Sequence, residues 1–326
     1  MLPLFIFASM AVLGLSSVLG LCTNSIIIAV NIVDKAKGKN LSSSDIILVT
    51  LSATNIFFQF AMLANDYLSF LWSDIYFSNE VYVTFSVMMT VCVYVSFWFI
   101  VCLSVSYCLQ IVIFTHTFLV RLKFGIFQVV VRLIMASVFI SMVTAIPAAW
   151  NFYRDPANVN LSGNSTEITI PKLSIVYLIP SNLISCSCPL VLVGIANGLI
   201  IKSLVIHKNK ADHNANRELN ARAEARKRAA RTIGLLLLLY IVFYVSEIFL
   251  IIDLFPPDSP GFCICLMVIY SYSPAQSIVL IFGSPKLKQV FIALIHCAGG
   301  QSKENLKTPK ALFIKINPLK VKPLAA

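Results

Sequence analysis

The sequence predicts an all-α membrane protein, a bundle of seven transmembrane helices with its N-terminus outside and its C-terminus inside. Three observations predict this fold. Of its 326 residues, 58% are hydrophobic and only 12% are charged, whereas soluble domains carry about 25% charged residues. The apolar residues form continuous runs of spanning length rather than alternating patterns, which favours helices over a barrel. The basic residues gather on one side of these runs.

Each predicted span is a continuous apolar stretch, and a helix needs about 20 such residues to cross the hydrocarbon core. The spans cover residues 7–31, 46–64, 81–110, 126–149, 174–204, 232–254 and 262–282. The third and fifth exceed the minimum length, so we expect tilt or protrusion there. Four prolines lie within spans, where neighbouring helices can satisfy the backbone groups that they free. They are Pro147, Pro180, Pro189 and Pro274.

The distribution of basic residues predicts the orientation. Eight Lys and Arg residues lie in the stretch 207–231 and eight Lys residues follow position 284, whereas the opposite side holds only Arg154 and Lys172. Because Lys and Arg are retained in cytoplasmic loops, the N-terminus is expected outside and the C-terminus inside. An odd number of spans also requires the two termini to lie on opposite sides.

Glycosylation sequons agree with this orientation. Asn160 and Asn164 each begin a sequon in the loop 151–172, which the charge count places outside. Asn40 also begins a sequon, but the same count places it inside, where it would not be used. We therefore expect glycosylation at Asn160 and Asn164.

Residues 1–296 are expected to form one bundle that ends in a short interfacial helix, 284–296. The apolar face of that helix, expected toward lipid, comprises Phe291, Leu294 and Ile295. The basic tail 297–326 is expected to be cytoplasmic and disordered, with Cys297 a candidate for palmitoylation. The stretch 217–231 is rich in Ala, Glu and Arg and is expected to extend the sixth span as a helix.

No enzyme, metal or nucleotide motif is found in the sequence. It has neither a GxxxxGK phosphate loop nor an HExxH zinc-protease motif, and no CxxC pair faces a second one among its nine cysteines. The formal charge of +11 is explained by membrane topology. We therefore expect the lipid bilayer, rather than nucleic acid, as a partner, and no cofactor.

A small-solute transporter is an alternative that the sequence leaves open. Transporters often carry internal repeats with matching broken helices, and no segment here recurs. Channels and pumps place ionisable groups at membrane depth, but of Arg132, Lys202, Glu247 and Asp253 only Glu247 lies well inside a span. Seven spans and a long basic third inner loop are instead the outline of a G-protein-coupled receptor.

The third span carries the most specific motif, "SFWFIVCLSVSYCLQIVIFTH" from Ser96 to His116. It resembles the bitter taste receptors (type 2 taste receptors). The matching positions are Trp98, Phe99, Cys102, Leu103, Ser104, Val105, Tyr107, Leu109, Ile111, Phe114 and His116. The motif departs from the family at Ser106 and at Gln110, where the family usually has Lys.

Other segments resemble the same family in the same order. "CTNSIII" contains Asn24, and "SDIILVTLSATNIFF" contains Asn55 where the family has Arg. "CPLVLVGIANGLIIKSLVIHK" matches at Pro189, Ser203, Leu204 and His207, "LLLLLYIVFYVS" at Tyr240, and "QSIVLIFGSPKLKQVF" at Ser277. The resemblance covers about residues 10–296.

The resemblance implies a chemosensory G-protein-coupled receptor that binds small bitter compounds in the outer half of its bundle. Its partner would be a heterotrimeric G protein of the gustducin or inhibitory type, and its location the plasma membrane. A vomeronasal-type pheromone receptor has a related outline and is the alternative among receptors. By position, the pocket residues of the family fall on Asp66, Met89, Val93, Phe243 and Leu266.

Glu247 is the other candidate ligand residue. It lies four residues after Phe243, so both share one helical face. A charge at the centre of a bilayer costs roughly 3 kcal/mol on insertion scales, so an unpaired one needs a reason. Glu247, with or without Asp66, would attract an amine ligand. The alternatives are that Glu247 reaches outer water, or is protonated and bonded to a neighbouring hydroxyl.

Asn24, Asn55 and Ser277 are candidates for a shared polar network within the bundle, since buried polar groups in lipid need partners. The alternative is that each bonds its own helix backbone. The resemblance adds Trp98, Tyr107, Gln110, Pro189 and Tyr240 to the structural and activation residues. It places Tyr107, His116, Ser203, Leu204, His207 and Arg228 on the G-protein face. We expect Tyr107, Gln110 and His116 to meet water and the G protein.

Overall fold

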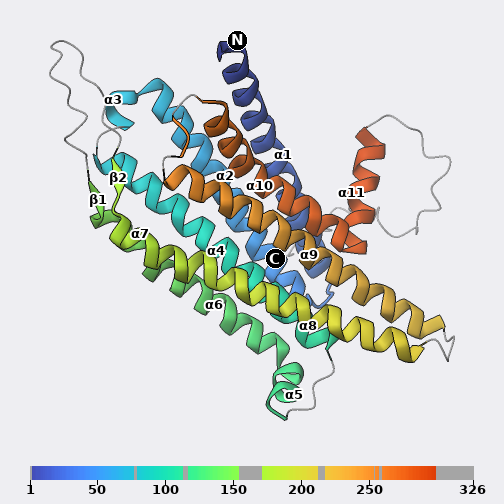
Figure 1. Cartoon of the computed structure of the whole chain (residues 1–326). Coiled ribbons are helices and arrows are strands. Elements are labelled where there is room, and N and C mark those ends of the chain that lie inside the picture. The colour runs from blue at the N-terminus through green and yellow to red at the C-terminus, as the bar shows by residue number, and fades with distance from the viewer. Residues whose placement is uncertain are drawn as a thin grey trace, which may run out of the picture.

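The computed structural model describes residues 2–76, 79–112, 117–153, 171–211, 217–252, 254–256 and 259–298. It is an antiparallel bundle of long helices, drawn in Figure 1. The elements are α1 (Leu2–Ala36), α2 (Ser43–Leu71), α3 (Ser73–Tyr76), α4 (Asn79–Ile111), α5 (Thr117–Phe124), α6 (Ile126–Ala145), the 3₁₀ helix η1 (Ile146–Trp150), β1 (Phe152–Tyr153), β2 (Lys172–Leu173), α7 (Ile175–Asn182), the π-helix η3 (Leu183–Ser187), α8 (Cys188–Ala211), α9 (Arg217–Ile251), α10 (Pro260–Gly283) and α11 (Pro285–Ala298).

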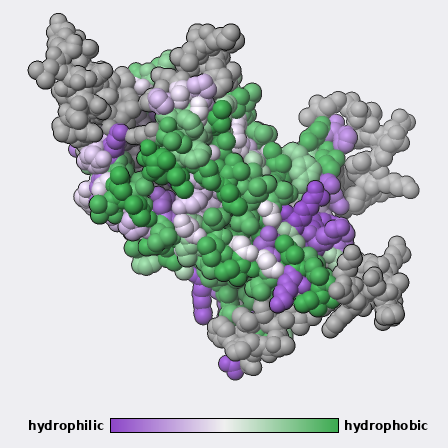
Figure 2. All heavy atoms as spheres, in the orientation of Figure 1, coloured by the Kyte–Doolittle hydropathy of each residue, from purple (hydrophilic) through white to green (hydrophobic). Residues whose placement is uncertain are grey.

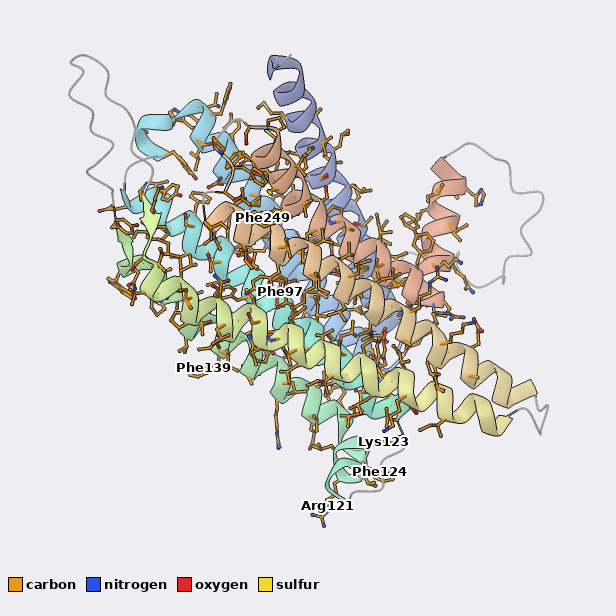
Figure 3. All side chains as sticks on the ribbon, viewed as in Figure 1. Phe97, Arg121, Lys123, Phe124, Phe139 and Phe249 are labelled. Atoms are coloured by element: carbon orange, nitrogen blue, oxygen red, sulfur yellow. The ribbon has the colours of Figure 1, made fainter. Side chains whose placement is uncertain are left out.

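Seven helical segments in the described part of the chain are long and apolar enough to cross a membrane, as the sequence predicts. They are Met10–Ala36, Ser43–Leu71, Glu80–Ile111, Ile126–Trp150, Ile175–Ile206, Ala223–Ile251 and Pro260–Gly283. Apolar residues cover most of the visible face between the two ends of the bundle (Figure 2). Phe139 of α6 is 69% exposed and points away from the bundle in Figure 3, as a lipid-facing side chain would.

Local sequence explains where several helices begin and end. The hydroxyl of Ser42 accepts from the backbone N–H of Asp45, whose carboxylate accepts from the N–H of Ser42, so the two residues form a capping box before α2. Ser259 caps α10 at the N–H of Phe262, with Pro260 in the first turn. Gly38 adopts a φ of 78° just after α1, a backbone conformation that glycine reaches without strain.

Two predicted spans are not uniform α-helices, and in both a proline lies in or just after the irregular segment. The fifth, expected as one helix over 174–204, consists of α7, the π-helix η3 and α8. Pro189 has no N–H and its ring crowds the carbonyl of Ser185, so the backbone before it widens into a π turn. The fourth tightens into the 3₁₀ helix η1, which contains Pro147.

α4 is the central helix of the bundle, since it packs against α2, α6, α8 and α9. The main apolar core surrounds it and includes the fully buried Phe97, Ile100 and Leu103. Figure 3 places Phe97 in the middle of the bundle, between the helices that flank α4. Residues on α4 are therefore in position to contact both the polar and the aromatic groups described below.

The bundle has two distinct ends (Figure 1). At one, the hairpin end, β1 and β2 pair antiparallel, and the ring of Tyr82 near the start of α4 contacts Phe152 of β1 at 5.9 Å. At the other, the basic end, lie α5 and the first turns of α9. The basic stretch 217–231 continues into the sixth span as one helix, as its composition predicts.

α11 forms the predicted helix after the seventh span, but its contacts correct one expectation. Leu294 and Ile295 are about half exposed, whereas Phe291 packs against the main core and contacts the ring of Phe282 at 6.1 Å. Phe291 therefore helps to fix α11 to the bundle rather than facing lipid alone. Cys297 is exposed on this helix, and residues 299–326 of the predicted tail lie outside the described residues.

Candidate functional site

A network of side-chain amides joins α1, α2 and α10 in the interior. Asn55 donates from Nδ2 to Asn24 Oδ1 at 3.2 Å and to Gln276 Oε1 at 2.7 Å. Asn24 donates in turn to Ser273 Oγ at 3.4 Å and to the carbonyl of Gly20 at 2.8 Å. All of these side chains are buried. In a membrane interior, such bonds satisfy groups that lipid cannot, so they fix how the three helices pack.

Ser277 belongs to a second link between α1 and α10. Its hydroxyl lies 2.6 Å from Thr23 Oγ1 and donates to the carbonyl of Pro274 at 2.9 Å. Ser277 therefore bonds both another helix and its own backbone. The close approach depends on Gly20, where an added Cβ would come within 2.9 Å of Gln59 and 3.3 Å of Pro274.

An aromatic cluster lies beside the amide network, toward α4 and α9. The rings of Phe97 and Tyr240 stack with centroids 3.8 Å apart, and Phe97 also meets Phe243 edge-on at 5.5 Å. Tyr272 of α10 packs on Phe243 at 4.6 Å and on Phe97 at 6.0 Å. Such aromatic pairs contribute about 0.5–1.5 kcal/mol beyond the area they bury. The cluster thus holds α4, α9 and α10 together at mid-bundle.

Tyr272 connects the aromatic cluster to the amide network. Its ring belongs to the cluster, and its hydroxyl accepts a hydrogen bond from Gln276 Nε2 at 3.2 Å. Gln276 in turn accepts from Asn55. A continuous series of contacts therefore runs from Phe243 through Tyr272 and Gln276 to Asn55 and Asn24.

Tyr240 also ties α9 to the irregular fifth span. Its hydroxyl donates to the carbonyl of Cys186 at 2.6 Å, and the side chain is fully buried. That carbonyl lies in the π-helix before Pro189, itself buried. The proline thus shapes the backbone segment that Tyr240 contacts. The ring of Tyr240 is held by Phe97 while its hydroxyl is held by η3.

Two predicted ligand residues lie together in a second apolar cluster nearer the hairpin end. Met89 and Val93 pack against Phe58, Met62 and Tyr270, so α4, α2 and α10 meet there. Leu266 of α10 is half-buried. Phe243 is only 2% exposed, and its ring is covered by Phe97 and Tyr272. A compound that reached Phe243 would have to move those rings.

Asp66, near the hairpin end of α2, is already hydrogen-bonded. The hydroxyl of Tyr270 donates to its Oδ2, and Asn65 Nδ2 donates to its Oδ1 at 3.4 Å. Asn65 also accepts from Tyr76 through its Oδ1 at 2.5 Å. Asp66 therefore joins α2 to α10, and its carboxylate has protein partners at both oxygens.

Glu247 differs from Asp66. Its Oε2 is buried and has no hydrogen-bond partner among the described residues. The residue as a whole is half-buried, and Oε2 bonds no hydroxyl of the described residues. Glu247 lies one turn beyond Phe243 on α9 and one turn before the end of that helix at Ile251.

At the basic end, α4, α8 and α9 close together over a third apolar cluster. Cys108, Ile111, Ala196 and Ile200 form it, with Tyr107, Val112, Leu204, Ala229 and Ala230 packed around. Tyr107 is thus half-buried, with part of its side chain packed between the helices. Gln110 is exposed, as expected, and donates to Ser44 and Ser106. Ser203 and Arg228 are half-buried beside this cluster.

The remaining predicted residues have less structural support. Trp98 is half-buried, and its Nε1 has no partner in the described part of the chain. His207 lies in α8, where only its backbone is described. His116, Asn160 and Asn164 lie outside the described residues. Among the described residues, no group of three or more His, Cys, Asp or Glu side chains could hold a metal ion.

α11 is tied to the end of α1 by charge. Lys286 Nζ lies 2.7 Å from Asp34 Oδ2 and donates to Asn31 Oδ1 at 2.7 Å. Lys39 binds the other oxygen of the same carboxylate at 3.0 Å. These contacts fix the first turn of α11 at the basic end of the bundle.

Sequence reasoning missed Phe97, Tyr272, Ser273 and Gln276. Ser273 and Gln276 are polar residues inside an apolar span, and Tyr272 lies one turn before Gln276, so these three could have been found by asking which groups need partners. Phe97 offers no such signal, because an aromatic residue in a membrane span is ordinary. Its role follows only from its stacking on Tyr240.

Comparison with known proteins identifies relatives of this chain. Residues 1–298 match the model of the family described as taste receptor protein (TAS2R). The chain is 30% identical over 284 residues to taste receptor type 2 member 40 of Gallus gallus, covering 86% of this chain and 91% of the relative. It is 27% identical over 300 residues to taste receptor type 2 member 3 of Homo sapiens, covering 91% and 95%. Taste receptor type 2 member 9 of Pongo pygmaeus is 26% identical over 282 residues, covering 85% and 90%.

Proposed function

The chain belongs to the type 2 taste receptors, the bitter taste family of G-protein-coupled receptors, and we propose that it binds small bitter compounds toward the hairpin end of its bundle and activates a G protein at the basic end. It is a multi-pass membrane protein and not an enzyme. The orientation that we propose has the N-terminus outside and the basic end in the cytoplasm. We place the protein in the plasma membrane, with the sequons at Asn160 and Asn164 exposed to glycosylation.

The proposed binding site is the region between the hairpin end and the aromatic cluster. Small-molecule sites between helices are lined by apolar and aromatic groups with a few polar ones. Met89 and Val93 on α4, Phe243 and Glu247 on α9, and Leu266 on α10 supply this mixture. Asp66 borders the same region through its bond with Tyr270.

The observation that carries the proposal is the series of contacts from Phe243 to Asn24. A compound that displaced Phe243 would disturb Tyr272, which packs on its ring at 4.6 Å. Tyr272 holds Gln276, and Gln276 holds Asn55. Binding would thereby change the relative stability of two packings of α2, α9 and α10. A ligand shifts such an equilibrium by its difference in affinity for the two states.

The proposed G-protein surface is the basic end around the α4–α8–α9 cluster. Tyr107 and Leu204 hold these helices together there in the packing described here. Arg228, Ser203, His207 and His116 belong to the same end of the chain. If α9 moved away from α4 and α8, the cluster would open and expose a surface for the G protein. By resemblance, we propose a G protein of the gustducin or inhibitory type.

A cell assay tests this function. The chain, with an N-terminal epitope, would be expressed in cells that lack endogenous inhibitory-type α subunits and are supplied with gustducin α. Epitope staining of intact cells reports both surface delivery and an outside N-terminus. The proposal predicts a calcium response to compounds of a bitter panel that requires the added α subunit and is blocked by pertussis toxin.

Two results would contradict the proposed orientation or the proposed coupling. Epitope staining that appears only after permeabilisation would overturn the proposed orientation. A compound-dependent response of the surface-exposed chain that persists without any G protein would overturn coupling. Phe139 is exposed on the outside of the bundle, so the variant Phe139→Leu should reach the cell surface as the wild type does. It is the matched control for surface delivery.

A further inference from the structure

The carboxylate of Glu247 is the starting point, because its Oε2 is buried without a partner, whereas three other acids in the described parts of the spans have partners. Asp34 binds Lys39 and Lys286, and Asp66 binds Tyr270 and Asn65. Asp45 takes part in the capping box with Ser42. Glu247 Oε2 alone among these carboxylate oxygens is buried without a hydrogen bond, and no ion pair between described residues includes Glu247.

The neighbours of Glu247 cannot satisfy this oxygen as they stand. Tyr240 and Tyr244 lie on α9, seven and three residues before Glu247, and Tyr94 of α4 packs in the same apolar core as both. Each already has another partner. Tyr94 bonds Ser181 at 3.3 Å, Tyr240 donates to the Cys186 carbonyl at 2.6 Å, and Tyr244 bonds Ser187 at 2.8 Å. Among the described residues, Glu247 Oε2 is thus a buried acceptor without a partner, and these three tyrosine hydroxyls are already paired with other groups.

We propose that Glu247 is the anchor for a protonated amine, and that this receptor is therefore tuned to small organic cations with an N–H donor. An isolated carboxylate in an apolar site is unfavourable unless a counter-charge and a hydrogen bond compensate it. An ammonium group supplies both. Phe243 and Tyr244 lie about one turn before Glu247 on α9, and aromatic rings add favourable contacts with a cation through their negative faces.

The pairing pattern distinguishes Glu247 from Asp66. Both acids lie toward the hairpin end, and the sequence alone allows either to attract an amine. Asp66 already accepts hydrogen bonds at both oxygens and holds α2 against α10. The structure therefore assigns Asp66 to a packing role and Glu247 to the ligand. A metal ion is not the cation inferred, since a single carboxylate without a second ligand would bind one weakly.

This inference rests on the proposed function, and its test separates the two. The probes are aryl-alkyl amines and their N-acetyl derivatives, which keep the shape and the N–H but lose the charge. Binding is measured as the rise in melting temperature of the purified chain in nanodiscs, which needs no G protein. The wild-type chain is expected to be stabilised by amines and not by their acetylated derivatives.

Variants sharpen the result. Glu247→Gln keeps the size of the side chain and removes its charge, and we expect it to weaken amine binding roughly 30-fold or more. Asp66→Asn is the matched control and is expected to leave the preference for amines intact. If Glu247→Gln does not fold, the wild-type chain still shows whether binding requires a positive charge, through the comparison of each amine with its acetylated derivative.

The outcomes differ for the two claims. Three results would overturn the assignment of Glu247. They are equal binding of amines and their acetylated derivatives, no binding of any amine, and an equal loss of amine binding in Asp66→Asn and Glu247→Gln. Amine binding without G-protein activation in cells would leave the assignment intact and overturn the proposed function instead. G-protein responses to neutral bitter compounds only would support the function and overturn the amine preference.

Discussion

Asn55 donates a 2.7 Å hydrogen bond to Gln276 across the interface of α2 and α10, with both side chains buried. Two neutral amides thus meet at the position of Asn55, where the bitter taste receptors carry an Arg on the second span. A neutral pair satisfies its own donors and acceptors without the cost of burying a charge. This bond joins the aromatic cluster to α1. Gln276 donates to Tyr272 of the cluster, and Asn55 donates to Asn24 of α1.

Replacing Asn55 by Leu should therefore loosen three helices at once. The change leaves Asn24 Oδ1 and Gln276 Oε1 without their donor, and we expect a loss of about 1–2 kcal/mol in unfolding free energy. Melting of the purified chain in nanodiscs measures this loss. Thr54→Val is the control, because the Thr54 hydroxyl bonds only the carbonyl of Thr50 in its own helix. An equal effect of both changes would count against the network.

Tyr240→Phe should weaken the attachment of α9 to the π-helix while keeping the ring. The change removes the hydroxyl that donates to Cys186 but leaves the stacking on Phe97. We expect about 1 kcal/mol of destabilisation and a raised ligand-independent signal, since α9 is held less firmly. Tyr244→Phe removes a half-buried hydroxyl bonded to Ser187 and should change the basal signal less. Basal activity per surface receptor measures the difference, and the reverse order would be inconsistent with the proposed role.

Gly283→Ala should force α9 and α10 apart near the basic end. An added Cβ would come within 2.6 Å of Thr232 Oγ1 and 2.8 Å of its Cγ2, which is closer than real Cβ contacts. We expect overpacking to cost about 1–3 kcal/mol. Thr232→Ala removes both of these atoms, so the double variant should recover much of the loss. Thermal melting of the four proteins measures the coupling, and simple additivity would refute the contact.

Lys286→Met should destabilise the attachment of α11 more than Lys39→Met does. Lys286 contacts both Asn31 and Asp34 and is 34% exposed, whereas Lys39 contacts only Asp34 and is 66% exposed. Exposed ion pairs contribute about 0–1 kcal/mol, so the Lys39 change should be near neutral. Hydrogen exchange of the α11 backbone measures local opening. Equal exchange in the two variants would show that Asn31 adds nothing.

Much of the fold could be predicted from the sequence, because lipid imposes simple demands on it. Continuous apolar runs require helices, and the helical extension of the sixth span follows from the composition of 217–231. The π-helix before Pro189 could not be predicted, since a proline in a membrane helix can produce a kink, a π turn or little change. The packing of Phe291 on the core could not be predicted either, because an amphipathic face does not say which of its residues the bundle itself partly covers.

The candidate site could be predicted less well, for a physical reason. Resemblance identifies which positions line a pocket, but pairing depends on neighbours from other helices. Asp66 and Glu247 look alike in the sequence, yet one is hydrogen-bonded at both oxygens and the other has an unpaired oxygen. The partner of Asn55, Gln276, lies far away in the chain; its polar side chain in an apolar span indicates a need for a partner but not which partner.

Tyr272→Phe tests the central claim most directly, namely that ligand binding toward the hairpin end reaches the G protein through the aromatic cluster and the amide network. The change keeps the ring on Phe243 but removes the hydroxyl that accepts from Gln276. Agonist binding and G-protein activation would be measured in the same nanodisc preparation, with Tyr244→Phe as the control. We predict binding close to that of the wild type, with activation potency changed about fivefold or more. Unchanged activation, or parallel losses of binding and activation, would contradict the claim.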